Sequence, residues 1–181
     1  MIAVFLRGEL DSDRWGATLR ELLARDACDE SVLRDPQPSG ADYRRRLLDE
    51  HRAYERREGL FLDFPRHVEW QRAALERDEV LEILYINWDW WLTLSGGTRS
   101  PRDAARRIRA GEVAGVDVAD AAFESEAPPE LILVATPDHQ RLVVLEGHGR
   151  LTAYAVFPER LPVELELLLG VSAEMAAWTE F

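Results

Sequence analysis

The sequence predicts a mixed α+β fold whose strands lie mainly in the second half of the chain. Three short runs there have the β-branched and leucine-rich character of strands: LILVA (131–135), RLVVLE (141–146) and VELELLL (163–169). The first half instead carries apolar residues at helical spacing among many charges. At 181 residues, 46% of them hydrophobic, the chain suits one domain, or one domain with an added helical layer. We expect a single domain over residues 1–181, with a mainly helical N-terminal part at 1–80 and a sheet-bearing core at 81–181.

The N-terminal part is expected to begin with a strand and continue mainly as helices. The apolar run at 2–7 predicts the strand, and Asp11 or Ser12 then caps a helix that ends near Asp26. Two prolines and a glycine at 34–40 indicate a loop. The remaining elements expected here are a polar helix over 42–57, a strand over 59–64 and a helix near 66–77.

The polar helix over 42–57 carries an unusual number of arginines. They are Arg44, Arg45, Arg46, Arg52, Arg56 and Arg57. Acidic residues stand close to most of them, so we expect a solvated helix linked by ion pairs. An anion-binding patch on this helix is the alternative.

In the second half, the segment 81–91 (LEILYINWDWW) fits either a strand that turns into a helix or one buried helix. The next helix has a clear start, with Ser100 as its N-cap and Pro101 as its first residue. The first two C-terminal strands are separated by a short segment with Pro and Asp, which predicts an antiparallel pair. The other elements expected are a loop over 120–130, a helix over 149–157 and a short final helix over 172–178, capped by Ser172.

Composition excludes several classes of protein. The net charge of −12 repels phosphate backbones on average, which argues against a nucleic-acid partner. The N-terminal apolar run ends at Arg7, too short for a signal sequence or a membrane span. Cys28 is the single cysteine, so no internal disulfide can form. We therefore expect a cytoplasmic protein with no membrane partner.

All 22 basic residues are arginines, and codon bias in a GC-rich genome is the simplest explanation. Whatever its cause, the absence of lysine excludes a Walker-type lysine, a Schiff-base lysine and a lysine general base. Any bound phosphate must be held by arginine side chains, backbone N–H groups and helix dipoles. The helix that starts at Pro101 is locally basic in this otherwise acidic chain.

The strongest candidate site is the corner at 146–150 (EGHGR), where a strand turns into a helix. Gly147 and Gly149 allow unusual backbone conformations and a close approach of a ligand. The first N–H groups of the helix lack intrahelical partners, and the helix dipole favours an anion there. Arg150 lies in the first turn of this helix, where the helix dipole disfavours a positive charge. A residue that is unfavourable for the helix itself points to a bound anion as the reason for its presence. An ordinary surface turn is the alternative.

The stretch 142–166 (LVVLEGHGRLTAYAVFPERLPVELE) resembles a box of the ParB/sulfiredoxin superfamily. In that box a strand ends in Asp/Glu-Gly-(His, Cys or Glu)-x-Arg, and a later strand is entered through Pro-Val. The residues of this chain that match are Glu146, Gly147, His148 and Arg150, followed by Pro162 and Val163. The similarity is close over this stretch and loose over about residues 80–170. It implies a ParB/sulfiredoxin-like mixed sheet with surrounding helices, to which the N-terminal part is added.

The resemblance also implies binding of a nucleotide (ATP, ADP or CTP), with Mg²⁺ beside its phosphates. The expected nucleotide-binding residues are Gly147, Gly149, Arg150 and Thr152, and a second wall of the pocket could contribute Arg99 and Arg102. Glu146 is the expected metal ligand or base. His148 is the expected acid/base or phosphate donor, so these two are the candidate catalytic residues.

Members of the superfamily include CTP-binding chromosome-partition proteins, an ATP-using sulfinic acid reductase and a free-serine kinase. The reductase has a cysteine at the position of His148, so its chemistry is not expected here. Partition proteins continue into a helix-turn-helix module, which is not expected here because only 31 residues follow Arg150 in the sequence.

Three functions stay open. The first is kinase-like phosphotransfer from a nucleotide to a small-molecule substrate. The second is a nucleotide-sensing or protein-interaction module, in which Trp88, Trp90 and Trp91 would form a partner surface. The third is a nuclease, against which the acidic composition and the lack of a carboxylate cluster both count. The oligomeric state is not predicted.

Overall fold

The computed structural model of the chain describes residues 1–12, 14–113 and 130–181. The chain divides into two compact units, Met1–Phe64 (unit 1) and Pro65–Phe181 (unit 2). Unit 1 is helical and unit 2 contains a four-stranded mixed sheet with helices around it, so the predicted α+β class is confirmed. The helical part ends at Phe64, before the boundary expected near residue 80. Apart from Glu130, the expected loop at 120–130 lies outside the described residues.

Unit 1 is built from four helices and two 3-10 turns around a core of leucine and phenylalanine. The elements are α1 (Ile2–Leu10), α2 (Gly16–Arg25), α3 (Ser31–Arg34), η1 (Pro38–Gly40), α4 (Ala41–Arg52) and η2 (Gly59–Phe61). Buried core residues are Phe5, Leu6, Leu19, Leu23, Leu33, Leu47, Leu48, Phe61 and Phe64. The loop predicted at 34–40 therefore includes the end of α3 and the turn η1.

Both strands predicted in unit 1 are wrong. Residues 2–7 lie inside α1, because the apolar run continues at helical spacing and buries Phe5, Leu6 and Leu10 together. Residues 59–64 contain the 3-10 turn η2 (Gly59–Phe61) and no strand. Its aromatic rings are used in packing, with Phe61 and Phe64 edge to face at 5.6 Å between centroids.

A buried ion cluster joins α1 to α4. The Glu9 side chain is 2% exposed, and its Oε2 lies 2.5 Å from Nε2 of His51, whose side chain is equally buried. Arg52 donates to the other oxygen of Glu9 and also lies over the ring of Trp15, at 4.8 Å from its centroid. An interior carboxylate is thus neutralised from α4, which orients the two helices.

The predicted ion-paired surface of α4 is confirmed only for some of its arginines. Arg45 pairs with Glu55 at 3.0 Å, as expected for a solvated helix. Arg44 is instead buried, and it donates to the carbonyl oxygens of Val32 and Gln37. The acidic residues near these arginines in the sequence therefore predict the interaction partners of only some of them.

Unit 2 contains the sheet, whose strand order is β1-β4-β2-β3. Strand β2 pairs antiparallel with β3 and parallel with β4, and β4 pairs antiparallel with β1. The elements are β1 (Glu69–Glu76), α5 (Arg77–Val80), α6 (Asp89–Ser95), α7 (Pro101–Arg109), β2 (Leu131–Ala135), β3 (Leu142–Glu146), α8 (His148–Val156), η4 (Pro158–Arg160), β4 (Glu164–Val171) and η5 (Ala173–Ala177).

Strand β1 replaces the helix predicted near 66–77, so that prediction is wrong. It pairs with β4 over its full length, from Glu69 opposite Val171 to Glu76 opposite Glu164. Its exposed and half-buried residues alternate along most of the strand. Trp70 packs on Gly170 of β4, where any added side chain would collide with the indole. The strand conformation of this segment thus depends on pairing with the apolar strand β4 more than on the intrinsic preferences of its own residues.

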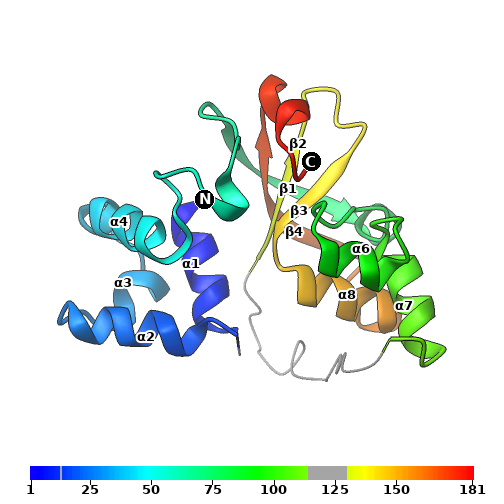
Figure 1. Cartoon of the computed structure of the whole chain (residues 1–181), viewed down its shortest axis with the longest axis horizontal. Helices are drawn as coiled ribbons and strands as arrows, with labels where there is room; N and C mark the ends of the chain where they lie inside the picture. The colour runs from blue at the N-terminus through cyan, green and yellow to red at the C-terminus, as the bar shows by residue number, and fades with distance from the viewer. Residues whose placement is uncertain (13, 114–129) are drawn as a thin grey trace. The chain divides into compact units, whose positions relative to one another are not determined.

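Helices α6, α7 and α8 lie together beside the sheet (Figure 1). The core between them includes Leu94, Ala104, Leu151, Tyr154, Leu131, Leu133, Val144, Leu167 and Leu169. The predicted β2–β3 pair and the helix starting at Pro101 are confirmed. Within 81–91, Leu84 bridges Val143 before α6 begins, which agrees with the strand-then-helix alternative. The final helix is the 3-10 segment η5, with the Ser172 hydroxyl accepting from Glu174 N at 3.2 Å.

Candidate functional site

The corner predicted from the sequence forms where β3 passes through Gly147 into α8. Gly147 has φ +101°, a left-handed conformation that other residues adopt only under strain. A side chain there would also collide with Leu131 of β2 and crowd the Arg150 guanidinium. The Gly147 carbonyl accepts the first helical hydrogen bond, from Leu151 N at 2.9 Å. Glycine is therefore required by the turn itself, with or without a ligand.

Gly149, one residue inside α8, is exposed and stands in open space. A Cβ built at this position would meet no heavy atom within 4 Å. Glycine is thus not required here by packing, and it weakens a helix relative to alanine. Its presence leaves the backbone of the first helical turn accessible to a ligand.

Arg150 and Glu146 form a loose ion pair at this corner. Arg150 Nη2 lies 3.9 Å from Glu146 Oε1, and the two side chains are only 14% and 18% exposed. The guanidinium folds back beside Gly147, so it lies at the start of α8 rather than extending into solvent. The charge of Arg150 is partly offset by Glu146, which makes the corner less cationic than the sequence alone indicates.

The His148 side chain stacks with two aromatic rings. Its ring lies 4.7 Å from Trp91 and 6.1 Å from Tyr85, with all three planes nearly parallel. Trp91 comes from α6, so this stack joins α6 to the first residue of α8. Sequence reasoning assigned His148 to the corner but missed the two rings that orient it, because they lie more than fifty residues earlier.

Thr152 lies in the core beneath the corner rather than on its surface. Its side chain is 3% exposed, and its Oγ1 is 2.8 Å from the His148 carbonyl and 2.7 Å from the Tyr85 hydroxyl. Burial raises the pKa of that hydroxyl well above its usual value, so Tyr85 stays protonated. The expected phosphate contact of Thr152 is therefore replaced, in this structure, by contacts that hold the start of α8.

Arg99 binds backbone oxygens. Its guanidinium donates to the Tyr85 carbonyl at 2.7 Å and to main-chain oxygens of Phe181 and Glu180 at 2.7 and 3.1 Å. Burial lowers its pKa from the usual arginine value. Arg102 lies on the exposed side of α7, where it pairs with Glu82 at 2.9 Å. The structure thus gives these two residues partners outside the 146–150 corner.

The basic character of α7 is largely explained by helix capping. Arg107 donates to the carbonyls of Thr93 and Leu94 at the end of α6. Arg109 donates to the carbonyls of Ala155 and Val156 at the end of α8, the former at 2.9 Å. Cations at helix C-termini satisfy carbonyls that lack intrahelical donors and favour the dipole. Arg107 and Arg109, which contribute to the local basic character of this helix, are therefore used for packing α7 against α6 and α8.

Among the residues that the structure describes, no three His, Cys, Asp or Glu side chains gather into a group that could hold a metal ion. Glu146 is the carboxylate of the corner itself, so a divalent cation there would need most of its ligands from phosphate oxygens and water. Over the same described segments, no helix has the length and apolar character needed to cross a membrane. A scan against protein-family models, a search of curated proteins and a search of solved structures each found no match to this chain.

Proposed function

We propose that the chain binds the phosphate groups of a nucleotide (ATP, ADP or CTP) at the start of α8. The observation that carries the proposal is the open backbone at Gly149, next in sequence to Arg150, whose guanidinium lies beside Gly147 at the start of α8. N–H groups at a helix start and a planar guanidinium are together a strong set of donors for phosphate. The similarity of 146–150 to the ParB/sulfiredoxin box supports a nucleotide as the source of that phosphate.

Mg²⁺ fits this proposal through Glu146. A carboxylate beside a bound phosphate is repulsive, and a divalent cation between the two would turn the repulsion into attraction. Mg²⁺ commonly uses one or two carboxylates and takes its other ligands from phosphates and water. Glu146 would then exchange part of its contact with Arg150 for the cation, leaving Arg150 to the phosphates.

The chemistry proposed at this site is phosphotransfer to a small-molecule substrate. His148 starts the helix that would hold the phosphates, and Glu146 ends the strand before it. An imidazole and a carboxylate flanking one phosphate are suited to accept or donate the proton of an attacking hydroxyl. Both residues are therefore proposed as catalytic.

A nucleotide sensor without turnover is the second candidate. It is favoured by the hydrogen bonds that lead from His148 through Thr152 to Tyr85. The Tyr85 carbonyl in turn accepts from Arg99, which holds Glu180 and Phe181. A shift at the start of α8 would pass along these contacts to residues far from it in sequence.

Thermal unfolding with ATP, ADP or CTP, each with and without Mg²⁺, tests the proposal. We expect at least one nucleotide to raise the Tm, and Arg150→Gln to weaken its binding about tenfold to a hundredfold. Arg106→Gln is the matched control, since Arg106 is 74% exposed in the same unit and pairs only with Asp103 in the described structure. No Tm shift with any nucleotide, or equal losses in the two variants, would refute the phosphate site.

Conversion of the nucleotide to its diphosphate or monophosphate, measured in the same samples with and without added hydroxyl-bearing metabolites, separates the two candidates. Turnover that is lost in His148→Asn or Glu146→Gln, with nucleotide binding retained, supports phosphotransfer. Binding without turnover, accompanied by slower amide exchange at Tyr85 and at 178–181, supports the sensor.

A further inference from the structure

Three aromatic rings from separate segments of unit 2 stack at the start of α8. Their centroids are 4.7 Å apart for Trp91 and His148, 4.8 Å for Trp91 and Tyr85, and 6.1 Å for Tyr85 and His148. The planes of both pairs with His148 are 17° apart, and those of Tyr85 and Trp91 are 24° apart. Tyr85 precedes α6, Trp91 lies within α6 and His148 begins α8.

Tyr85 and His148 cover the same face of the Trp91 indole. Stacked rings are separated by about 3.5 Å between planes, so two rings on opposite faces of one indole would be roughly 7 Å or more apart. The 6.1 Å between Tyr85 and His148 is shorter than that. Both rings therefore lie on one face of the indole, and neither of them covers its other face.

The indole of Trp91 also keeps exposed surface. Tyr85 is fully buried, whereas Trp91 and His148 are each only partly buried. Because Tyr85 and His148 cover one face of Trp91, its exposed surface belongs to the opposite face and the rim of the indole. His148 directly precedes Gly149, where a Cβ would meet no heavy atom within 4 Å, so this aromatic surface adjoins the backbone proposed to bind phosphate.

The ring cluster is organised before any ligand arrives. Tyr85 is fixed in the core by the 2.7 Å hydrogen bond between its hydroxyl and Oγ1 of Thr152. Trp91 packs on this buried ring and against the core of unit 2. An indole that is already held in this way has little conformational freedom to lose when a flat molecule stacks on it.

We propose that the open face of Trp91 binds the base of the nucleotide, and that this base is a purine. The inference rests on the proposed phosphate site, because the bound phosphates bring the base close to α6. Stacking on an aromatic side chain is a favourable contact for any nucleobase. A purine has two fused rings and covers an indole more completely than the single ring of a pyrimidine, so this surface favours ATP and ADP over CTP.

Calorimetric titration of the full chain with ATP, CTP and tripolyphosphate, each with Mg²⁺, tests the proposal. Tripolyphosphate supplies the phosphate groups without a base. It is at least as highly charged as the phosphates of ATP, so electrostatic attraction alone would not favour ATP over it. We expect ATP to bind about tenfold more tightly than tripolyphosphate, and the affinity for CTP to lie between the two.

Variants on α6 assign the preference to the indole. Trp91→Leu keeps an apolar side chain but removes the aromatic face, so it should weaken ATP binding about tenfold and leave tripolyphosphate binding unchanged. Trp91→Phe keeps an aromatic face and should retain part of the affinity for ATP. Trp90→Leu is the matched control, because Trp90 is 51% exposed on the same helix and is not one of the three stacked rings. This variant should bind both ligands as the original chain does.

The outcomes separate the base site from the phosphate site. If neither ATP nor tripolyphosphate binds, the proposed phosphate site fails and the base site fails with it. Equal affinities for ATP and tripolyphosphate would refute the base site and leave the phosphate site intact. An affinity for CTP equal to that for ATP would overturn the assignment to a purine. These three comparisons use the unaltered protein, so they are decisive even if a variant folds poorly.

Two results with Trp91→Leu would also overturn the base site. One is an affinity for ATP equal to that of the original chain. The other is an equal loss of affinity for ATP and for tripolyphosphate, which would show that Trp91 supports the phosphate site rather than the base.

Discussion

The Tyr85 hydroxyl donates to Oγ1 of Thr152 across 2.7 Å in the interior of unit 2. The direction is fixed because Thr152 has one hydroxyl proton and gives it to the His148 carbonyl, which can only accept. The side chain of Thr152 is therefore both donor and acceptor at the base of the α8 corner. Tyr85→Phe removes one of these contacts and Thr152→Val removes both, so the two substitutions should differ in cost.

Thr152→Val should destabilise the protein more than Tyr85→Phe. Valine keeps the shape but leaves the buried Tyr85 hydroxyl without an acceptor, a loss of about 1–3 kcal/mol. Phenylalanine removes the donor together with its need for a partner, at about 1 kcal/mol. Urea unfolding measures both, with Thr152→Ser as a control that keeps both hydrogen bonds. Equal stability of Thr152→Val and the original chain would contradict this arrangement.

The two glycines of the corner should respond to alanine in opposite ways. Gly147→Ala combines a left-handed φ with a collision against Leu131, so we expect a loss of at least about 2 kcal/mol. Gly149→Ala enters open space in a helix and should gain about 0.5–1 kcal/mol. If phosphate approaches this backbone as proposed, the same methyl group should weaken nucleotide binding. A Gly149→Ala protein that is more stable but binds ATP as the original chain does would agree with the open space at Gly149 and would contradict the proposed phosphate site.

Glu9→Gln should be among the most damaging single substitutions in unit 1. It leaves the Arg52 guanidinium, whose side chain is 12% exposed, without its counter-ion, and breaking such a pair costs about 3–5 kcal/mol. Glu21→Gln, at an exposed position of α2, is the matched control and should change the free energy of unfolding by less than about 0.5 kcal/mol. Similar values for the two variants in chemical denaturation would show that the Glu9 cluster contributes little.

Glu180 should make the protein less stable as the pH rises from acid toward neutral. Burial raises the pKa of its carboxyl, against a hydrogen bond from Trp88 and the charge of Arg99, which lower it. The folded state therefore holds this proton more tightly than the unfolded state, whose pKa is about 4.3. The stabilisation that this tighter proton binding contributes is fully present below the unfolded pKa, and it is lost as the pH rises through the higher pKa of the folded state.

Glu180→Gln removes the titration, so it should gain stability relative to the original chain between about pH 4 and pH 7. The side chain is partly exposed, which limits the expected gain to less than about 1 kcal/mol. Unfolding curves of both proteins at several pH values provide the measurement. A stability difference that stays constant with pH, or that runs in the other direction, would exclude this role.

The features that the sequence predicts correctly are those with local signals. The β2–β3 pair follows from two apolar runs and a short polar connection, and the start of α7 follows from Ser100 and Pro101. The turn at Gly147 can also be predicted from the sequence, because a glycine between a strand and a helix indicates a backbone conformation that other residues rarely adopt.

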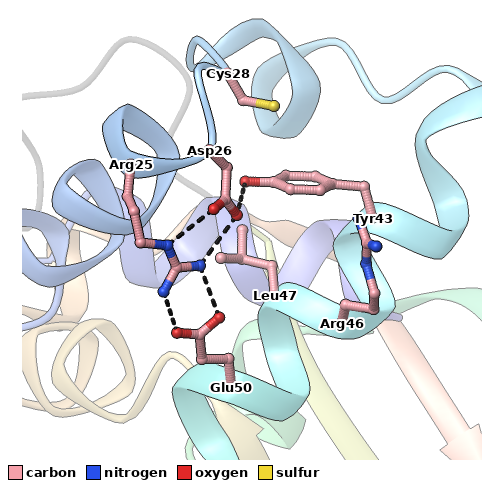
Figure 2. Close-up of a pocket in the computed structure, with 7 residues that line it drawn as sticks. All are labelled: Arg25, Asp26, Cys28, Tyr43, Arg46, Leu47 and Glu50. Carbon is pink, nitrogen blue, oxygen red and sulfur yellow. Dashed lines mark hydrogen bonds and ion pairs between the residues drawn. The ribbon is translucent and has the colours of Figure 1, made fainter.

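The features that the sequence does not predict depend on distant partners. Strand β1 has the composition of a helix, and its pairing with β4 joins segments almost a hundred residues apart. The local positive charge of the helix that carries Arg107 and Arg109 has no explanation in the sequence, because the helix ends that these residues cap are distant along the chain. A surface pocket of unit 1, lined by residues of α4 and of the end of α2 (Figure 2), has no sequence motif, because it depends on how the end of α2 meets α4.

The position of β1 has a consequence for the solubility of the chain. It is an eight-residue strand at the end of the sheet order, and among the described residues it is paired through β4 alone. An edge of this length is a template for strands of other molecules, and charged side chains are a common protection against such pairing. Glu69, Arg72 and Glu76 are exposed along it. These charges make the segment difficult to recognise as a strand from its sequence. They would also protect the exposed edge of β1 from pairing with strands of other molecules.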